Sequence, residues 1–231
     1  MKNMKVGEIV AENIKYAEVF YRHNIDFCCK GNISLEEAAK VKNVDLEQIT
    51  TELQAINGID DMTDYRQMSS EALIKDIIET HHEYIRENKD MIKALLKKVV
   101  SVHGDNHPEL QDIYDLYNES IAQLSLHMEN EEVNLFPRIL KHINGDADGQ
   151  NISSHDLIEQ LKQEHSNEGD RFEHITVLSD NFTPPADACN TYKFVFNKLD
   201  EFQKDLHRHI HKENNILFPR VAEAEQSSSI A

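Results

Sequence analysis

One short pattern occurs twice in this chain, in residues 127–138 and again in residues 209–220. Each copy begins with His, has Glu four residues later and ends in Leu-Phe-Pro-Arg. On a helix, residues four apart lie on the same face one turn apart, so each copy directs an imidazole and a carboxylate the same way. Both groups are common metal ligands. The duplication therefore predicts helices that bring together a site for two metal ions.

The repeat extends upstream of both motifs, around His82 and His165. Apolar residues stand eight and four positions before His82 and ten and thirteen positions after it, and the same offsets from His165 are also apolar. The neighbouring His81 fits this frame less well, because its later positions are Met91 and Ala94. Each half is therefore predicted to be a helix with one His followed by a helix with a His/Glu pair, and His82 is preferred over His81.

Six side chains from four helices make up the predicted ligand set. Imidazole and carboxylate donors suit iron or manganese better than thiolate-binding metals, and iron is the metal expected in such a bundle, with zinc as an alternative. If both carboxylates bridge, room is left for an oxo or hydroxo bridge and for an open position that takes a small ligand. The set is His82, His127, Glu131, His165, His209 and Glu213.

Two further histidines need separate interpretation. His103 lies 21 residues after His82, and an unbroken helix would separate them by about 30 Å. One site cannot use both, so His103 is expected outside the ligand set unless that helix breaks and folds back. His155 and Glu159 share the motif spacing but no Leu-Phe-Pro-Arg follows, and chance explains that pair.

Helix-length segments separated by turn signals predict an all-α fold. Gly, Asp and Pro cluster in the short breaks between the long segments. Such lengths and connections predict an antiparallel four-helix bundle. Pro137 and Pro219 are expected to bend or end their helices one or two turns beyond the His/Glu pairs. The four predicted helices cover roughly residues 70–101, 109–143, 153–180 and 186–222.

The N-terminal part of the chain predicts a small helical domain with three short helices. Patterns of the capping-box type begin at Ser34 and Asp45 and start the second and third of them. The predicted boundaries are 1–58 for this domain, 59–69 for a linker, 70–222 for the bundle and 223–231 for a flexible tail.

The negative charge of the chain limits its partners. The 24 Lys and Arg residues against 42 Asp and Glu residues give a formal net charge of −18, which repels phosphate backbones and anionic membrane surfaces. Nucleic-acid and membrane binding are therefore not expected. No apolar signal-peptide core follows the first residues, and no long uncharged run could span a bilayer, so a cytoplasmic protein is predicted.

Two adjacent cysteines, Cys28 and Cys29, stand between a predicted helix and a turn at Gly31. Neighbouring cysteines can form a disulfide only through a strained ring, so a structural disulfide is not expected. Lys30 and a nearby helix start would lower a thiol pKa, which suits iron transfer or redox exchange. Two partly buried small residues in a turn are an equally good interpretation, and both stay open.

The module with Asp26-Phe-Cys-Cys-Lys-Gly31 and the block from His209 to Arg220 together resemble the bacterial repair-of-iron-centres family, the ScdA/YtfE/DnrN group. The resemblance covers nearly the whole chain and implies a hemerythrin-like bundle with a non-haem di-iron centre. It also implies a cytoplasmic homodimer that helps to restore iron-sulfur clusters damaged by nitrosative or oxidative stress. By the same resemblance, the iron ligands fall on the six residues above and the N-terminal cysteines on Cys28 and Cys29.

Three functions are open on these grounds. The leading hypothesis is a non-enzymatic repair protein that supplies iron to damaged iron-sulfur proteins or binds nitric oxide. The second is a sensor or carrier of oxygen or nitric oxide, and the third is a di-iron oxidase or nitric oxide reductase. Both second-helix motifs here end in Glu, whereas oxygen-carrying hemerythrins use an extra His and an Asp, which disfavours simple oxygen storage.

Overall fold

The computed structural model describes residues 1–56, 64–143 and 155–228, and these divide into two compact units. The first, here called the terminal unit, joins residues 1–75 with residues 207–231, and the second, the bundle unit, consists of residues 76–206. Helices build both units, and the described residues contain no strand beyond one isolated bridge, Lys5 to Ser34. The predicted all-α class is therefore confirmed.

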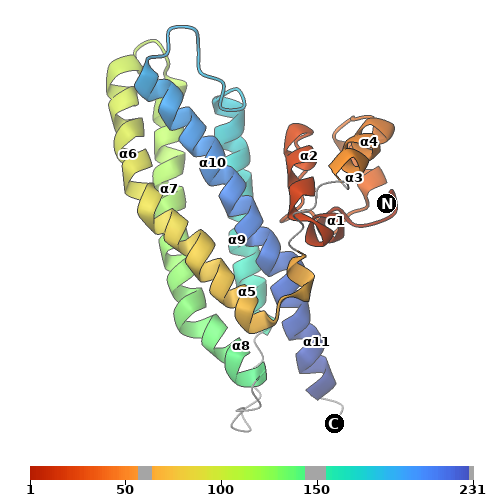
Figure 1. Cartoon of the computed structure of the whole chain (residues 1–231). Coiled ribbons are helices and arrows are strands. Elements are labelled where there is room, and N and C mark those ends of the chain that lie inside the picture. Colours follow the sequence, from red (N-terminus) through yellow and green to blue (C-terminus); the bar gives the residue numbers. More distant parts are fainter. Residues whose placement is uncertain (57–63, 144–154, 229–231) are drawn as a thin grey trace. The chain divides into compact units, whose positions relative to one another are not determined.

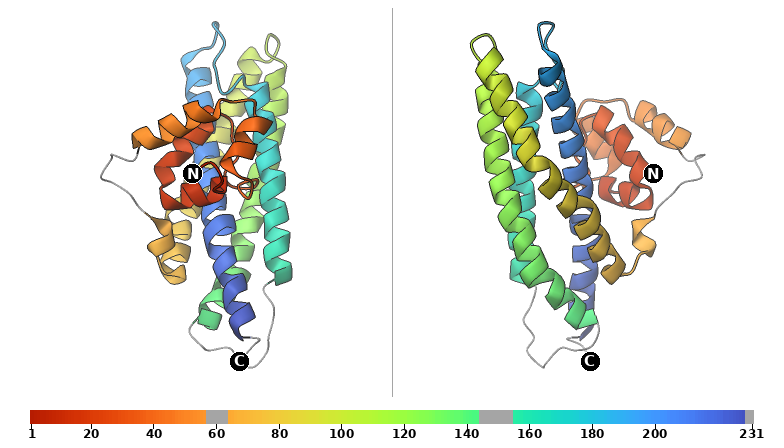
Figure 2. Two further views of the ribbon diagram at one scale, coloured as in Figure 1. Left: turned by 90° about the vertical axis from the view of Figure 1, so that its right-hand side faces the viewer. Right: turned by 60° about the vertical axis from the view of Figure 1, so that its left-hand side comes forward.

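Four long helices form the bundle unit and run alongside one another in Figures 1 and 2. Short connections at 104–108 and 179–189 make the helices that they join antiparallel. The ring of Phe202 lies at the centre, with centroids 5.6 Å from Tyr117 and 5.6 Å from Phe172. The helices are α6 (Glu83–His103), α7 (Glu109–Asn130), α9 (His155–Leu178) and α10 (Asn190–Lys212), the last of which contributes its residues up to Leu206.

Three π-helical turns interrupt the long helices. The turns are η3 (Ile77–His82), η4 (Glu131–Leu135) and η5 (Glu213–Leu217). In η4 the N–H of Phe136 donates to the carbonyl of Glu131, five residues back, and in η5 Phe218 donates to Glu213 in the same way. Such wide turns occur often at functional sites, and here η4 and η5 begin at the Glu of each His/Glu motif, whereas η3 ends at His82.

The two prolines of the motifs do not end their helices, which was one of the two predicted outcomes. Pro137 and Pro219 were expected to bend or end their helices, but each helix passes through the wide turn and continues. A proline has no N–H to donate four residues back, and the π turn just before it already shifts the hydrogen bonds. The continuing helices are α8 (Phe136–Ile143) and α11 (Phe218–Ser228).

Helix α11 also corrects the predicted end of the bundle. It runs to Ser228, where a flexible tail was expected from residue 223. Residues 222–226 read Ala-Glu-Ala-Glu-Gln, all strong helix formers, which explains the extension. The predicted linker overlaps residues 57–63 and the predicted break after the second helix lies in 144–154, and both ranges fall outside the described residues.

The N-terminal part of the terminal unit contains four short helices where three were predicted. Asn13 adopts an extended conformation and its side chain accepts a hydrogen bond from the Lys15 N–H, which splits the first predicted helix. The Ser34 hydroxyl accepts from the Glu37 N–H at 3.2 Å and Asp45 from the Glu47 N–H at 2.9 Å, as expected of helix N-caps. The helices are α1 (Val6–Glu12), α2 (Ala17–Arg22), α3 (Leu35–Val41) and α4 (Leu46–Ile56), and α5 (Ser70–Asp76) follows.

The C-terminal segment of the chain belongs to the same terminal unit as these helices. The Arg220 guanidinium donates to the carbonyls of Met68 at 2.8 Å and Arg66 at 2.9 Å. The Asn215 side chain donates to the carbonyl of Cys28 at 3.2 Å. The Arg of the second Leu-Phe-Pro-Arg thus anchors the segment that precedes α5, and the π turn η5 contacts the cysteine loop.

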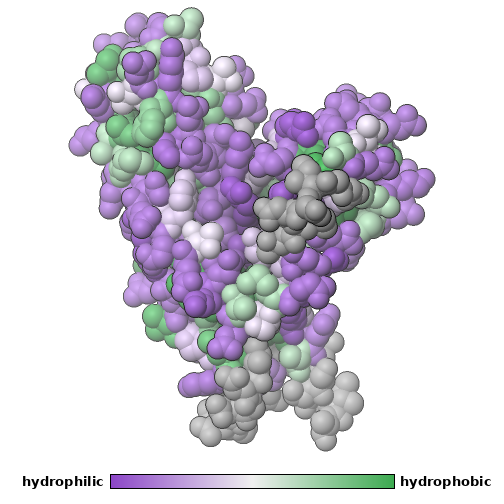
Figure 3. Space-filling view, viewed as in Figure 1, coloured by the Kyte–Doolittle hydropathy of each residue, from purple (hydrophilic) through white to green (hydrophobic). Residues whose placement is uncertain are grey.

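The surface seen in Figure 3 is mostly hydrophilic, as the charge of the chain predicts. Within the described ranges, no helix combines the length and the apolar character needed to cross a bilayer. The apolar residues instead line the interior of each unit, for example Phe20 and Leu35 in the terminal unit and Phe196 and Leu199 in the bundle unit.

Candidate metal centre

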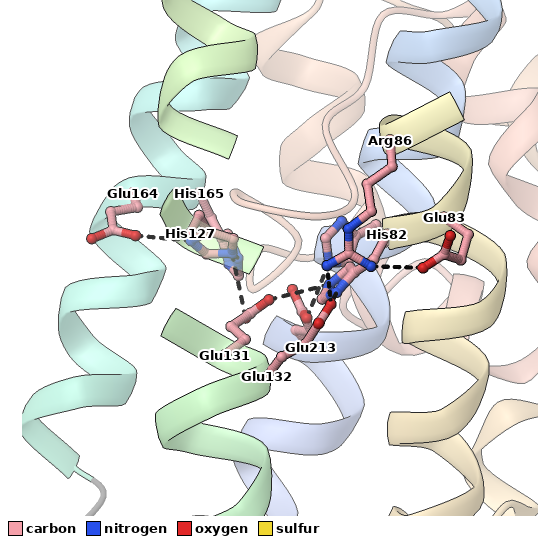
Figure 4. Close-up of polar contacts among 10 residues, drawn as sticks. His82, Glu83, Arg86, His127, Glu131, Glu132, Glu164, His165 and Glu213 are labelled. Carbon is pink, nitrogen blue, oxygen red and sulfur yellow. Dashed lines mark hydrogen bonds and ion pairs between the residues drawn. The ribbon is translucent and has the colours of Figure 1, made fainter. Parts of the chain in front are cut away.

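Glu131 lies at the centre of the candidate site in the bundle unit. Its side chain is fully buried, and its two carboxylate oxygens face different imidazoles. Oε2 lies 3.4 Å from Nε2 of His82, and Oε1 lies 3.3 Å from Nε2 of His127. Figure 4 shows Glu131 between these two histidines. A carboxylate in this orientation can give one oxygen to each of two cations.

His165 completes one side of this cluster. Its Nε2 lies 3.0 Å from Nε2 of His127, and His127, Glu131 and His165 each offer a ligand atom within 4.8 Å of the others. Two imidazole lone pairs that face each other repel unless a proton or a cation lies between them. Two nitrogen ligands about 2.0 Å from a tetrahedral metal lie about 3.3 Å apart, so the observed spacing is close to that of ligands to one metal.

Two outer carboxylates orient the imidazoles. Nδ1 of His82 lies 2.6 Å from Glu132, and Nδ1 of His127 lies 2.8 Å from Glu164. Each carboxylate accepts the Nδ1 proton and leaves the Nε2 lone pair directed at the site, which is the usual arrangement of a metal-binding histidine. Figure 4 shows both pairs and the guanidinium of Arg86, which lies 2.6 Å from Glu132.

These carboxylates stay ionised because of their partners. Burial raises the pKa of Glu132, but hydrogen bonds from His82 and Arg86 outweigh it and hold that pKa below its usual value. The hydrogen bond from His127 lowers the pKa of Glu164 despite partial burial. Neither residue was predicted from the sequence, although each stands directly beside a predicted ligand in the chain, Glu132 after Glu131 and Glu164 before His165.

The terminal unit carries the second His/Glu pair. Nε2 of His209 lies 3.1 Å from Oε1 of Glu213, and both side chains are buried. The corresponding atoms of His127 and Glu131 lie 3.3 Å apart, so the two copies of the motif have the same local geometry. In both copies the His lies in the last turn of a long α-helix and the Glu begins a π turn.

His81 and His103 make other contacts. Nδ1 of His81 lies 2.8 Å from Asp205, whereas its neighbour His82 faces Glu131. Helix α6 runs unbroken to His103, whose ring lies 5.3 Å from that of Tyr192. His103 is thus a full helix away from His82, and among the described residues it joins no potential metal cluster.

A pocket of about 260 Å³ in the bundle unit is lined by His127 and His165 among other residues. Glu168 lines the same pocket and is only 3% exposed. Burial raises the pKa of Glu168 to about 7, although the hydrogen bond from Arg171 opposes the change. Glu168 and the two imidazoles therefore line the same pocket. Nothing in the periodicity of the sequence marked Glu168.

A helical bundle in which His and Glu clusters could hold metal ions defines a class of helical cation-binding proteins. Residues 73–221 match the hemerythrin HHE cation binding domain, and residues 2–57 match ScdA_N, which is described as a domain of unknown function.

Relatives match over nearly the whole chain. The iron-sulfur cluster repair protein ScdA of Staphylococcus haemolyticus (strain JCSC1435) is 34% identical, over 94% of this chain and 97% of the relative. ScdA of Staphylococcus epidermidis (strain ATCC 12228 / FDA PCI 1200) is 30% identical, over 94% and 97%. The iron-sulfur cluster repair protein YtfE of Yersinia pseudotuberculosis serotype O:1b (strain IP 31758) is 31% identical, over 97% and 99%. The chain therefore belongs to the family of hemerythrin-domain iron-sulfur cluster repair proteins.

Proposed function

We propose that this protein repairs damaged iron-sulfur clusters and that it holds two bridged iron ions for this purpose. The six side chains that would bind them are the four histidines and two glutamates of the duplicated pattern. The repair function follows the names of the relatives, which match this chain over nearly its full length. The ligands are His82, His127, Glu131, His165, His209 and Glu213.

The orientation of Glu131 is the observation that carries this proposal. Its two oxygens face His82 and His127 separately. Each of these imidazoles is turned inward by an outer carboxylate, as a metal ligand requires. His209 and Glu213 repeat the His127/Glu131 geometry, and the hemerythrin domain match spans all six residues.

The donor set also suits the release of iron. The bound iron pair would supply the cargo for rebuilding a cluster and an open position for a small ligand. Carboxylate and imidazole ligands must be deprotonated to bind iron, and protonation of any of them weakens its bond to the metal. The affinity for iron therefore depends on pH and on the protonation state of these side chains. A pocket of about 260 Å³ lined by His127 and His165 supports access of an ion or a small molecule to these ligands.

Several finer features belong to the same proposal. The oxo or hydroxo bridge, nitric oxide or oxygen as small ligand, the response to nitrosative and oxidative stress, the homodimer and the cytoplasmic location are all expectations from the sequence that we retain here. The proposed recipients are damaged iron-sulfur proteins, as the names of the relatives suggest.

Replacing the bridging residues tests the ligand assignment. We expect Glu131→Leu and Glu213→Leu each to reduce bound iron sharply, because each removes a buried carboxylate that serves both metals. Glu129→Leu is a matched control, since Glu129 is exposed on the same helix as His127. Full iron loading in both Glu131→Leu and Glu213→Leu would refute the bridging assignment.

A second experiment separates iron donation from the rival functions. The iron-loaded protein is mixed with an enzyme whose [4Fe-4S] cluster has been damaged, and a chelator challenge runs in parallel. A donor loses iron as the recipient regains activity. Recovery without loss of iron, or gas binding with full iron retention, would instead indicate a sensor or carrier, and steady consumption of oxygen or nitric oxide with an electron donor would indicate an enzyme.

A further inference from the structure

The cysteine loop of the terminal unit brings three potential ligand atoms together. Sγ of Cys28 lies 3.7 Å from Sγ of Cys29 and 3.2 Å from Oδ1 of Asp26. One ligand atom from each of the three residues lies within 4.8 Å of the others. Cys28 is buried, at 3% exposure, and Asp26 and Cys29 are partly buried. This cluster shares no residue with the His/Glu ligands.

The sulfur spacing suits a shared metal and not a disulfide. Bonded sulfurs lie about 2.05 Å apart, and neither cysteine forms a disulfide. Two thiolates about 2.3 Å from a tetrahedral metal lie about 3.8 Å apart. The observed 3.7 Å therefore matches two ligands of one metal without movement of the backbone.

The loop is held in this shape by backbone contacts. Oδ1 of Asp26 accepts hydrogen bonds from the N–H groups of Cys28 and Cys29, both at 2.9 Å. Asn215 donates to the carbonyls of Phe27 at 3.3 Å and Cys28 at 3.2 Å. The ligand atoms are thus positioned before any ion arrives, which lowers the entropic cost of binding.

Tight packing on the other side of the loop adds to this rigidity. A Cβ atom on Gly31 would lie 2.3 Å from the carbonyl oxygen of Phe27. The Gly31 carbonyl also accepts the N–H of Gly7 at 2.8 Å. Only glycine permits so close an approach of the two loop ends, so the cysteines cannot move apart without breaking these contacts.

A bound cation would offset the cost of ionising the buried thiol of this cluster. The expectation that Lys30 and a nearby helix start lower the thiol pKa is wrong for Cys28, because burial raises the pKa of this thiol well above its usual value and Cys29 and Asp26 raise it further. Without a metal, Cys28 therefore keeps its proton. A divalent cation that binds here would displace that proton and compensate the negative charges of the thiolates and the carboxylate, as happens when thiols bind zinc. A purely structural role is the alternative, but the hydrogen bonds that Asp26 accepts from the backbone stabilise the turn without any need for two thiols beside the carboxylate.

We propose that Asp26, Cys28 and Cys29 form a second metal site, which binds a thiophilic divalent cation such as Zn(II) or Fe(II). Two thiolates and one carboxylate suit these ions better than Mg(II) or Ca(II). The site stands independently of the His/Glu centre. If the proposed function holds, the cysteine site also offers iron a second position. Asn215, which binds the cysteine loop, follows Glu213 by two residues on η5 and so links this loop to the second His/Glu pair.

Cobalt binding to the full-length protein tests this site. The protein is first loaded with iron and then titrated with Co(II) without oxygen, while thiolate-to-cobalt absorption in the near ultraviolet is followed. We expect absorption that saturates at one added Co(II) per chain and is displaced by Zn(II). Cys28→Ser and Cys29→Ser should each abolish it.

Two further variants guard against a loss of folding. Asp26→Asn keeps the oxygen that accepts the two N–H groups but removes the charge, and it should weaken Co(II) binding about tenfold or more. Cys189→Ser removes an exposed thiol of the bundle unit and should change nothing. Zn(II) should also protect Cys29, but not Cys189, from alkylation in the unmodified protein.

Several outcomes would overturn the proposal. Absence of the thiolate absorption, its survival in Cys28→Ser and Cys29→Ser, or its loss in Cys189→Ser would each do so. Iron content is measured on every sample before cobalt is added. A failure of the proposed di-iron centre appears in that measurement, whereas a failure of the cysteine site appears only in the cobalt titration.

Discussion

Nδ1 of His82 lies 2.6 Å from a carboxylate oxygen of Glu132, the residue that directly follows the buried Glu131. Because these two glutamates are neighbours at the start of a π turn, one faces the His82 Nε2 and the other binds the His82 Nδ1. Both nitrogens of one imidazole are therefore held by adjacent residues of a different helix. The orientation of His82 depends on the register between these helices.

The first prediction concerns this outer carboxylate. Glu132→Ala removes the acceptor of the His82 Nδ1 proton, so the imidazole loses its fixed tautomer and orientation. We expect iron affinity to fall by about 10- to 100-fold, measured by competition with a ferrous chelator, while the helical circular dichroism is unchanged. Glu129→Ala is the control, and equal affinities for the two variants would contradict the role of Glu132.

The second prediction concerns the core of the bundle unit. Phe202 is fully buried and packs on Phe172 and Tyr117, so Phe202→Ala leaves a cavity. We expect it to lower the free energy of unfolding by about 3 to 5 kcal/mol, measured by urea denaturation. Phe194→Ala on the same helix should cost far less, because Phe194 is 46% exposed. Similar losses for both variants would argue against this core.

The third prediction concerns the reactivity of Cys189. Backbone N–H groups at the start of α10, led by that of Tyr192, and the side chain of His103 lower the pKa of this exposed thiol to about 7. The reactive thiolate therefore appears as the pH rises through about 7. Iodoacetamide labelling followed by mass spectrometry should give a midpoint there, with Cys28 labelled far more slowly because it is buried.

His103→Gln provides the matching variant. Loss of the imidazole should move the labelling midpoint of Cys189 to higher pH, while the N–H groups of α10 keep it below the usual thiol value. A labelling midpoint of Cys189 at the usual thiol pKa in the unsubstituted protein would contradict the contact with His103. The same holds if His103→Gln leaves the midpoint unchanged. This measurement also gives His103 a role outside the metal centre.

The fourth prediction compares two glycines of the terminal unit. A Cβ on Gly31 would meet the backbone oxygen of Phe27 at 2.3 Å, whereas a Cβ on Gly7 would meet the side chain of Asn215 at 2.5 Å. A side chain can move but the backbone of the loop cannot. Gly31→Ala should therefore lower the free energy of unfolding by about 1 to 3 kcal/mol.

Gly7→Ala should be milder, because it lies in α1, where alanine gains about 1 kcal/mol of helix propensity over glycine. Thermal unfolding of the two variants under the same conditions measures the difference. A larger loss for Gly7→Ala than for Gly31→Ala would show that the loop backbone is not the rigid partner.

Local sequence signals predicted the helices well. Caps at Ser34 and Asp45, turn residues between long segments and apolar periodicity all act within a few residues, so they can be recognised without the fold. Their failures were also local. Asn13 splits one predicted helix, and the π turns at Glu131 and Glu213 let the helices continue past their prolines.

The candidate ligands were predictable because duplication repeats both residue type and spacing. His127 and Glu131 form a pair on one helix, and this relationship is visible in a linear sequence. Glu132, Glu164 and Glu168 were missed, since acidic residues are frequent in this chain and nothing in their spacing separates a buried partner from a solvated one.

The sequence by itself determined that the chain is helical, that its halves repeat, and that each repeat offers an imidazole and a carboxylate from one helix face. Only the tertiary structure decided that Glu131 turns its two oxygens to different histidines and that Asp205 binds His81 while Glu132 binds His82. The physical reason is distance along the chain: helix periodicity is set by neighbours three and four residues apart, whereas these contacts join helices whose register depends on the packing of the whole core.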